Sequence, residues 1–310
     1  MSNAPKPVHI SVADIGTNTI KVSHARVDAD GTIEERADAA ETIRIGAGIE
    51  ETGLIAQDRI DTCLQVLRDQ ESLGRSLGST VFAGVATEAL RVAANGSELL
   101  DRIRRETSWD IRTITGEDEA HLTWIGLRDR IPTSGSVLII DIGGGSTEIV
   151  RAKDDDVVAS TSIPIGSGRL ADRFFRADPP GIEVLQAATE FAATRVSAVD
   201  ILSAKADAIV FSGGNGIFLE QLAAQLFPAR ALSREVIVDL IDHFAKTPAS
   251  DTAARIDIAQ ERARVLPAGA AIALAILQHV SAESVAAAPS GIRIGLIREI
   301  THNFTHPPSS

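Results

Sequence analysis

The sequence predicts an α/β protein made of two similar domains. Its 310 residues are enough for two hydrophobic cores of ordinary size, and 44% of them are apolar against 23% charged. Segments with the two-residue period of strands alternate with segments of helical period, which is typical of α/β folds. A weak internal repeat is the third observation, because Asp14-Ile-Gly16 and Asp141-Ile-Gly143 superpose together with their flanking residues. Each copy has the pattern of a strand, a tight turn and a second strand, so a duplicated domain is expected.

Alternating or β-branched apolar residues predict the strands, and longer stretches of helical period predict the helices. The predicted strands span residues 8–14, 19–27, 32–43, 80–86, 136–141, 147–153, 157–164 and 208–212. The predicted helices span residues 57–77, 97–107, 115–130 and most of 234–280. Ser97 is expected to be the N-cap of the second of these helices. Pro267 and Gly269 interrupt the apolar stretch 265–280, which is therefore expected to be a buried helix and not a membrane span.

The boundary between the two domains is expected near residues 131–136. This stretch, Ile-Pro-Thr-Ser-Gly-Ser, consists of turn-forming residues without periodicity. The predicted domains are 1–130 and 131–310, and the C-terminal helix is expected to pack back on the first domain.

The charge balance argues against a broad nucleic-acid interface. Thirty basic and 42 acidic residues give a formal net charge of −12 at pH 7. A polyanionic ligand would then be held by backbone amides, a divalent cation or a few clustered basic side chains. The N-terminus shows no secretion signal, and Cys63 is the single cysteine, so no intrachain disulfide is possible. A cytoplasmic protein bound to neither membrane nor nucleic acid is expected.

The segment from Asp141 to Glu148 gives the sharpest chemical signal. Consecutive glycines let the backbone approach an oxyanion closely. The predicted phosphate-binding residues of this segment are Gly143, Gly144, Gly145 and Ser146. Neither a Walker A loop nor a dinucleotide loop fits, because the Walker lysine is absent and the residues after Glu148 alternate like a strand.

Asp141 and Glu148 would repel a bound phosphate unless a cation lay between them. Mg²⁺, with Mn²⁺ as a substitute, is the expected metal because it commonly binds one or two carboxylates together with phosphate oxygens and water. The competing interpretation is a glycine-rich hairpin with two solvated acids.

The first copy of the repeat, from Asp14 to Lys21, is a weaker signal. Its hydroxyl, amide and ammonium groups are suited to donate hydrogen bonds to phosphate. The predicted phosphate-binding residues of this turn are Gly16, Thr17, Asn18, Thr19 and Lys21. An isolated turn of this kind is more often structural, but its pairing with the second copy favours a function.

Three further segments leave structural and functional interpretations open. Acids in the first turn of a helix stabilise its dipole, and Thr115 with Asp118 resembles a capping box, so the residues alone favour capping there. Arg91 follows a buried strand and could contact a phosphate or lie on the surface. Gly213 and Gly214 could approach a ligand or form a tight strand-to-helix turn. The seven histidines show no metal-binding spacing.

Taken together, these motifs resemble the exopolyphosphatase/guanosine pentaphosphate phosphohydrolase (Ppx/GppA) family over nearly the whole chain. The matching segments are Asp14-Ile-Gly-Thr-Asn-Thr, Ala86-Thr-Glu-Ala-Leu-Arg, Thr115-Gly-Glu-Asp-Glu-Ala, Asp141-Ile-Gly-Gly-Gly-Ser-Thr-Glu, Pro164-Ile-Gly-Ser-Gly-Arg-Leu, Ser212-Gly-Gly and Ser290-Gly-Ile-Arg-Ile-Gly. The resemblance implies two actin-like domains of the sugar kinase/Hsp70/actin superfold, which is ribonuclease H-like, with an interdomain cleft. Longer members carry extra domains, so this chain resembles the short, two-domain branch.

The resemblance also assigns roles to single residues. It implies that Glu119 is the general base, which replaces the capping interpretation for this residue, and that Glu148 is a second catalytic carboxylate. It implies that Asp14, Asp141 and Glu148 hold the metal. Arg91 corresponds to a phosphate-contacting arginine and counts with the catalytic residues.

The implied activity is that of an exopolyphosphatase, which releases orthophosphate from the end of linear polyphosphate. The alternative is removal of the 5′ γ-phosphate of guanosine pentaphosphate, an alarmone. A kinase of the same superfold and a non-catalytic alarmone sensor are further possibilities, although the retained carboxylates argue against a sensor. A homodimer is also expected.

Overall fold

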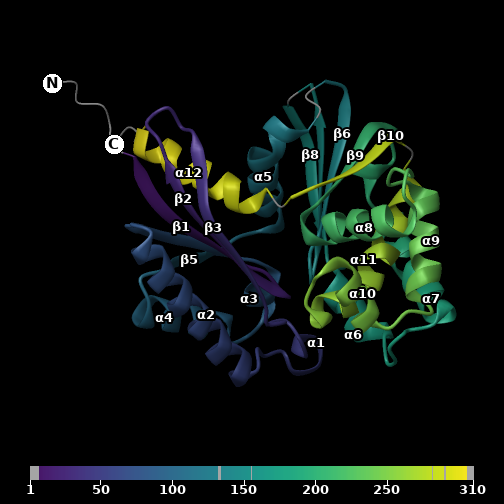
Figure 1. Ribbon diagram of the computed structural model, residues 1–310, viewed down its shortest axis with the longest axis horizontal. Helices are drawn as coiled ribbons and strands as arrows, with labels where there is room; N and C mark the ends of the chain where they lie inside the picture. The colour runs from purple at the N-terminus through teal and green to yellow at the C-terminus, as the bar shows by residue number, and fades with distance from the viewer. Residues whose placement is uncertain (1–6, 132–133, 155, 281, 290, 306–310) are drawn as a thin grey trace. The chain divides into compact units, whose positions relative to one another are not determined.

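The computed structural model describes residues 7–131, 134–154, 156–280, 282–289 and 291–305 (Figure 1). The chain forms two compact units. Unit 1 comprises Met1–Thr115 and Ile292–Ser310, and unit 2 comprises Gly116–Gly291.

Unit 1 is built on a five-stranded sheet with the order β3-β2-β1-β4-β5. β1, β2 and β3 are antiparallel neighbours, whereas β4 and β5 run parallel to β1. The strands are β1 (Val8–Ile15), β2 (Thr19–Val27), β3 (Ile33–Thr42), β4 (Val81–Ala86) and β5 (Asp110–Thr113). The helices of this unit are α1 (Ile49–Thr52), α2 (Gln57–Ser76), α3 (Glu88–Val92), α4 (Gly96–Glu106) and α12 (Ile292–Thr305).

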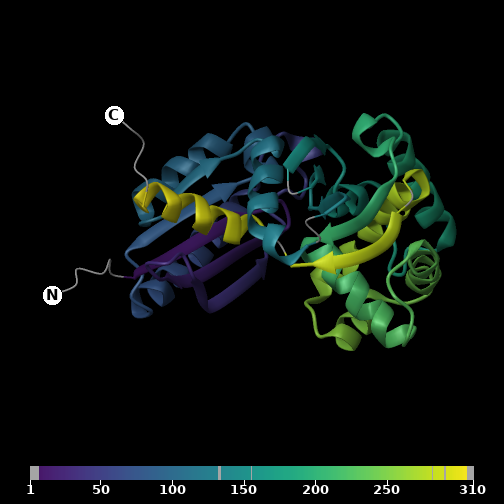
Figure 2. The same cartoon turned by 90° about the horizontal axis from the view of Figure 1, so that it is seen from above.

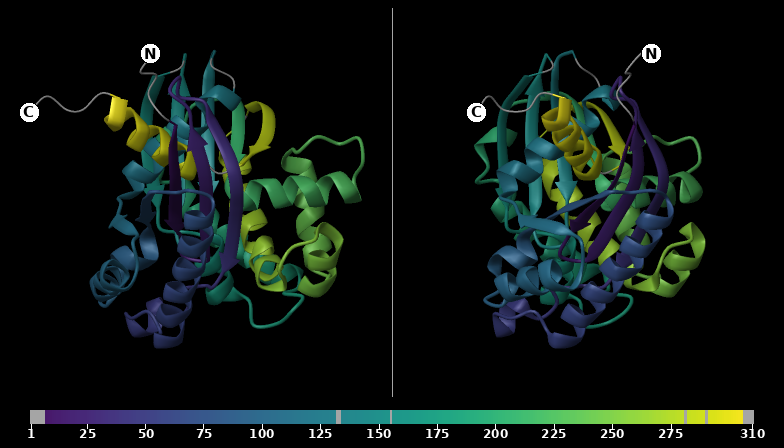
Figure 3. Two further views of the ribbon diagram at one scale, coloured as in Figure 1. Left: turned by 60° about the vertical axis from the view of Figure 1, so that its left-hand side comes forward. Right: turned by 90° about the vertical axis from the view of Figure 1, so that its left-hand side faces the viewer.

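The two faces of β1 have different neighbours. Ala13 and Ile15 share a buried core with Leu64 and Leu67 of α2. Asp14 lies between them in the chain and therefore points to the other face of the sheet. The C-terminal helix α12 packs against β1 and β2 (Figures 1 and 3).

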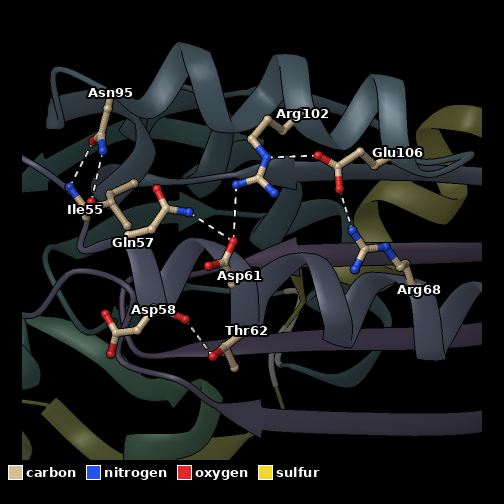
Figure 4. A network of polar contacts seen from close by, with 9 residues as sticks. All are labelled: Ile55, Gln57, Asp58, Asp61, Thr62, Arg68, Asn95, Arg102 and Glu106. Atoms are coloured by element: carbon tan, nitrogen blue, oxygen red, sulfur yellow. Dashed lines mark hydrogen bonds and ion pairs between the residues drawn. The ribbon is translucent and has the colours of Figure 1, made fainter.

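Helices α2 and α4 are also joined at the surface by a polar network (Figure 4). Arg102 forms ion pairs with Asp61 at 3.2 Å and with Glu106 at 2.9 Å, and Arg68 pairs with Glu106 as well. Partly exposed pairs of this kind contribute about 0–1 kcal/mol each, so the buried core is the main support of this layer.

Unit 2 repeats the architecture with a five-stranded sheet of order β10-β9-β6-β7-β8. The strands are β6 (Ser136–Ile142), β7 (Thr147–Lys153), β8 (Asp156–Ile163), β9 (Ala206–Ser212) and β10 (Ala282–Ala288). The helices are α5 (Gly116–Leu127), α6 (Ser167–Phe174), α7 (Ile182–Val196), α8 (Gly213–Leu226), α9 (Arg234–Phe244), α10 (Ala249–Ile256) and α11 (Gln260–His279), with short 3₁₀ turns at Arg128–Arg130 and Asp200–Leu202. Figure 2 shows β10 beside β9, with which it pairs in parallel.

The core of unit 2 is organised around α11. Its residues from Val265 to Leu277 are all buried, and many of them are alanines. Small side chains allow neighbouring helices to approach closely, and α11 packs against α6, α7 and α9. The expectation that 265–280 is a buried helix is confirmed.

The two sheets share one topology, which confirms the duplication predicted from the Asp-Ile-Gly repeat. In each, a meander of three antiparallel strands is extended by two parallel strands on the side of the first strand. The α/β class is confirmed as well.

Several details differ from the expectations. The helix predicted for 97–107 begins at Gly96, so Ser97 as its N-cap is wrong. Asn95 precedes this helix, and its side chain both donates to and accepts from the Ile55 backbone at 2.9 Å. α5 packs against β7 and β8 of unit 2, although the sequence analysis placed it in the first domain. Residues 132 and 133 of the expected connection, and residue 290 of the last matching segment, lie outside the described residues.

Candidate active site

Two tight turns, one in each unit, have the same backbone geometry. Gly16 N donates to Thr19 O at 3.1 Å, and Gly143 N donates to Ser146 O at 3.0 Å. A Cβ atom on either glycine would lie 3.1 Å from the carbonyl oxygen that it now contacts through its amide. The strand, tight turn and strand that the repeat predicted in both halves are confirmed.

The facing residues next to the two turns differ in charge: one turn has an acid opposite a base, and the other has two acids. Asp14 lies opposite Lys21 across β1 and β2, whereas Asp141 lies opposite Glu148 across β6 and β7. Opposite charges on facing strands attract and like charges repel. The turn of unit 2 therefore concentrates negative charge that the turn of unit 1 does not.

Serine hydroxyls hold both carboxylates of unit 2. Ser212 Oγ donates to Asp141 Oδ2 at 3.2 Å, and Ser162 Oγ donates to Glu148 Oε1 at 2.7 Å. Asp141 is 9% exposed and Glu148 is 3% exposed. The two acids are thus buried and fixed in position, which argues against the interpretation of a hairpin with solvated acids.

The first turn of α5 rests on the same serine that holds Glu148. A Cβ atom on Gly116 would lie 2.2 Å from Ser162 Cβ and 2.7 Å from Ser162 Oγ, so only a glycine allows this approach. Glu119 follows within that first turn. The helix start that carries Glu119 is therefore packed directly on the support of Glu148, within one unit.

Burial separates Glu119 from its acidic neighbours. Glu117 and Asp118 are exposed, whereas Glu119 is 6% exposed. Acids that only complement a helix dipole are normally solvated, as the first two are. The burial of Glu119 supports a separate role for it.

The glycine loop of unit 2 is in close contact with the start of α6. A Cβ atom on Gly166 would lie 2.4 Å from the Gly144 carbonyl carbon. Ser167 N donates to Gly143 O at 2.8 Å, and Arg169 N donates to Gly144 O at 2.9 Å. These bonds use the carbonyl groups of the loop and fix its conformation.

The start of α8, at Gly213 and Asn215, lies close to Asp141 and to the first turn of α6. Gly213 has a φ of +78°, and a Cβ atom there would lie 2.8 Å from Asp141 Oδ1. Asn215 is fully buried and donates to Ile142 O and to Ser167 Oγ. Of the two interpretations left open for this segment, the tight strand-to-helix turn is confirmed, because β9 ends at Ser212 and α8 begins at Gly213, and an approach to a ligand stays a prediction.

Arg262, at the start of α11, is a residue that the sequence analysis missed. A Cβ atom on Gly214 would lie 2.4 Å from Arg262 Nη2, so this glycine makes room for the guanidinium. The guanidinium also lies 5.4 Å from the centre of the Phe218 ring. Burial lowers the pKa of Arg262 to about 10, and the negative charge of Asp141 opposes that shift. Arg262 therefore supplies a positive charge near Asp141.

The turn of unit 1 contains two buried polar atoms that lack partners. Asp14 Oδ1 and Asn18 Nδ2 have no hydrogen-bond partner among the described residues, and the two residues are 4% and 5% exposed. Burial raises the pKa of Asp14, against the lowering effects of Lys21 and Arg293. A buried polar group without a partner costs about 1–3 kcal/mol of stability, and a ligand or water that bonded to these two atoms would remove that cost.

The remaining predicted residues of unit 1 already have protein contacts. Thr19 Oγ1 lies 3.4 Å from Thr42 Oγ1, and a Cβ atom on Gly46 would meet the Thr17 side chain. Arg91 is exposed and donates from Nη1 to Ile114 O. Arg91 thus supports the chain just before α5, and its predicted contact with phosphate stays a prediction.

Comparison with known proteins shows which family shares this sequence. The sequence matches the Ppx/GppA phosphatase family over residues 25–304. The chain belongs to this family. Exopolyphosphatase 1 of Mycobacterium leprae is 29% identical over 300 residues, which cover 94% of this chain and 88% of that protein. A guanosine-5′-triphosphate,3′-diphosphate pyrophosphatase of Vibrio campbellii is 25% identical over 97% of this chain but only 61% of its own length.

Solved Ppx/GppA structures share the fold. The Aquifex aeolicus family member superposes with a TM-score of 0.75 at 28% identity, covering 97% of this chain and all of that one. An exopolyphosphatase from Cytophaga hutchinsonii superposes with a TM-score of 0.84 at 21% identity, over 95% of this chain and 98% of that one, which shows the fold alone. The actin-like fold expected from the resemblance is confirmed.

A divalent cation fits the acids of unit 2. Asp141 and Glu148 are buried on adjacent strands beside a glycine loop, and Mg²⁺ commonly takes one or two carboxylates and completes its shell with water and phosphate oxygens. Within the described part of the chain, no three His, Cys, Asp or Glu side chains form a metal-binding group. A cation held here would thus depend on substrate and water for its other ligands. Asp14 also has an oxygen without a partner in the described part of the chain, but Lys21 and Arg293 already offset its charge.

The residues that support the acids of this Ppx/GppA site were not predicted. The sequence gives a usable signal for some of them and none for others. Ser212 and Asn215 lie inside a segment that was singled out for its glycines, so their polar side chains were a usable signal. Arg262 lies on α11, far from any motif in the sequence, and Ser162 lies on β8, two residues before the segment that begins at Pro164. Only the folding of unit 2 brings them to the acids. No helix in the described ranges is long and apolar enough to cross a membrane.

Proposed function

We propose that this chain is an exopolyphosphatase that releases the terminal orthophosphate of linear inorganic polyphosphate. Membership of the Ppx/GppA family supports hydrolysis of a phosphoanhydride. The match to an exopolyphosphatase over 88% of its length, against 61% for the pyrophosphatase relative, favours the polyphosphate substrate.

The observation that carries the proposal is the packing of α5 on Ser162. It seats the buried Glu119 in a helix turn that contacts the serine holding Glu148. A general base and a second carboxylate are thereby supported by one side chain, beside a loop of three glycines. No other cluster in the described residues combines these features.

In the proposed reaction, Glu119 orients a water molecule and accepts one of its protons. The water oxygen forms a bond to the terminal phosphorus while the bridging P–O bond breaks, and the electron pair stays on the shortened chain. The amides of Gly144 and Gly145, with Ser146, bind the terminal phosphate oxygens, while Gly143, whose own amide is bonded to Ser146 O, lets the backbone of the turn approach them. Arg262 offsets negative charge that the acids and the substrate bring together.

Asp141 and Glu148 are proposed to hold Mg²⁺, for which Mn²⁺ could substitute. When bound, the cation neutralises charge on the phosphate oxygens and so favours the approach of the nucleophile. The serine bonds from Ser212 and Ser162 orient the two carboxylates for this purpose.

The turn of unit 1 is proposed to bind a phosphate oxygen through Asn18 Nδ2, which is buried and has no hydrogen-bond partner among the described residues. Gly16, Thr17, Thr19 and Lys21 belong to the same proposed contact, with Asp14 as a further metal ligand. In unit 2, Gly213 and Gly214 are proposed to line the phosphate site through their backbones. Arg91 is proposed to contact phosphate with the part of its guanidinium that does not bind Ile114 O.

The alternative is hydrolysis of the 5′ γ-phosphate of guanosine pentaphosphate, because the same terminal anhydride is cut. The relatives named for that substrate extend well beyond the length of this chain. The homodimer and the cytoplasmic location expected from the sequence stay predictions.

Phosphate release from tripolyphosphate, long polyphosphate and guanosine pentaphosphate, measured side by side without an acceptor, tests the proposal. We expect the polyphosphates to be cut with the higher kcat/KM. A preference for guanosine pentaphosphate would establish the alternative. Turnover that requires an acceptor would indicate a kinase, and tight binding without turnover would indicate a sensor.

A further inference from the structure

A second basic feature of unit 2 lies at the junction of α6 and α7. The Phe191 ring of α7 has two arginines against it, with Arg195 Cζ at 3.5 Å and Arg173 Cζ at 4.6 Å from the ring centre. Phe174 meets the Phe191 ring edge-on, with ring centres 5.3 Å apart. Two guanidinium groups therefore lie within 4.6 Å of the centre of one aromatic ring.

These two arginines make few other polar contacts with the described residues. Neither forms an ion pair with any described residue, and Arg195 uses one N–H on Phe191 O at 3.3 Å. Arg173 is exposed, while Phe191 and Arg195 are partly exposed. Stacking on a ring leaves the N–H groups at the guanidinium edge free to bind an anion. In a protein with a net charge of −12, two arginines at one ring without an ion pair to any described residue are notable.

Helix α6 connects this pair to the glycine loop of the candidate active site. Its first turn is bonded to Gly143 and Gly144 through Ser167 N and Arg169 N. Arg173 follows Arg169 by four residues, so both project from one face of the helix. The rise from Ser167 to Arg173 is roughly 9 Å along the axis. A row of arginines therefore leads away from the loop over a short distance, with the acid Asp172 directly before Arg173 in the chain.

We propose that Arg173 and Arg195, stacked on Phe191, form an accessory site for the distal phosphates of a polyphosphate chain. The inference rests on the proposed function, because the end of that chain would be held at the glycine loop. An extended polyanion leaving this loop along α6 meets Arg169 and then the arginine pair. Such contacts act on phosphate charge at successive positions and read no base or sugar.

The shape of the site favours a phosphate chain over a nucleotide. A nucleobase is recognised by stacking on an open aromatic face, and Phe191 already has guanidiniums against it and Phe174 beside it. The guanidinium edges are complementary to phosphate oxygens. The accessory site would therefore favour long polyphosphate over both tripolyphosphate and guanosine pentaphosphate.

The test compares the double variant R173Q/R195Q with R230Q in the full chain. Arg230 is a matched control because it also stacks on a ring, Phe227 at 5.4 Å, but is paired with Asp239. We expect R173Q/R195Q to raise KM for long polyphosphate about tenfold, with kcat and the KM for tripolyphosphate unchanged. R230Q should match the wild type with both substrates.

A binding measurement makes the test independent of hydrolysis. In excess EDTA, we expect the Kd of long polyphosphate to rise about tenfold in R173Q/R195Q, and its dependence on salt to weaken. If the wild type releases no phosphate but this shift is found, the accessory site stands and the proposed function fails. Equal Kd values for the wild type and the double variant, or an equal loss for tripolyphosphate, would overturn the accessory site whatever the activity.

Discussion

Ser162, near the C-terminal end of β8, donates a 2.7 Å hydrogen bond from its Oγ to Glu148 Oε1. The same side chain supports the first turn of α5, where Gly116 leaves room for it. Two acids that lie far apart in the sequence, Glu119 and Glu148, therefore depend on one serine. Ser162 is a positioning residue in this arrangement, because it acts through the carboxylates and not on substrate.

The S162A variant should slow phosphate release about tenfold, because a hydrogen bond to a charged group contributes about 1.5–3 kcal/mol. The acid limb of the pH–rate profile should also move to higher pH, since a carboxylate that has lost a donor holds its proton more tightly. S160A, at an exposed position on the same face of β8, should leave both unchanged. A tenfold loss without a shift of the profile would point to a merely structural role.

Removal of the carboxylate of Glu119 should affect chemistry far more than folding. We expect E119Q to keep the thermal midpoint within a few degrees and to slow phosphate release at least a hundredfold, within the range of about 10²–10⁴ for general bases. E117Q changes an exposed acid in the same helix turn and should be nearly silent. Unchanged turnover in E119Q would refute the assigned role.

Chelation should abolish phosphate release if Asp141 and Glu148 hold a cation. Activity in excess EDTA is expected to fall to background and to return with Mg²⁺ or Mn²⁺, because the paired acids otherwise repel the substrate. An E148Q variant should need more Mg²⁺ for half-maximal rate. Full activity in EDTA would remove the metal from the mechanism.

Elements with a strong local signal were predictable from the sequence, and those fixed by tertiary contacts were not. β1, β2 and β6 alternate or consist of β-branched residues, and they were placed within a residue or two. β10 is rich in alanine and was missed, because it is a strand only through its pairing with β9. α5 was found as a helix, but its assignment to unit 2 depends on contacts with β7 and β8.

The candidate site divides in the same way. The glycine turns were legible because only glycine allows such close backbone contacts, and the repeat doubled the signal. Ser162, which donates to Glu148, and Arg262, which supplies positive charge near Asp141, lie outside the motif segments, and their importance follows from distances alone. Conversely, the acids at 117–119 look alike in the sequence, and burial distinguishes Glu119.

Gly213 should be intolerant of a side chain because of its contact with the acid of the site. Its φ of +78° strains any other residue, and a Cβ atom would also press on Asp141 Oδ1 at 2.8 Å. We expect G213A to lower the free energy of unfolding by about 1–3 kcal/mol and to reduce phosphate release. Gly53 has a φ of +71° with nothing within 4 Å, so G53A should lose stability alone. Equal activity in the two variants would show that the contact with Asp141 has no role.

His243, at the end of α9, should make stability fall in mild acid. Burial, and then the charge of Arg255, lower the pKa of this histidine below its ordinary value of 6.5. Its Nε2 is buried without a partner in the described structure, so the native state gives a proton there no acceptor. Between the ordinary and the lowered value the unfolded chain binds more protons than the native one, and the free energy of unfolding therefore decreases as pH falls below about 6.5. Below the lowered value, His243 causes no further decrease of the free energy of unfolding.

Urea unfolding of H243Q at about pH 7.5 and at about pH 5 should show a smaller loss of stability than the wild type, because glutamine does not titrate. H279Q, which removes an exposed histidine at the end of α11, should retain the wild-type loss. If H243Q and the wild type lose the same stability over this range, the pH dependence comes from other groups.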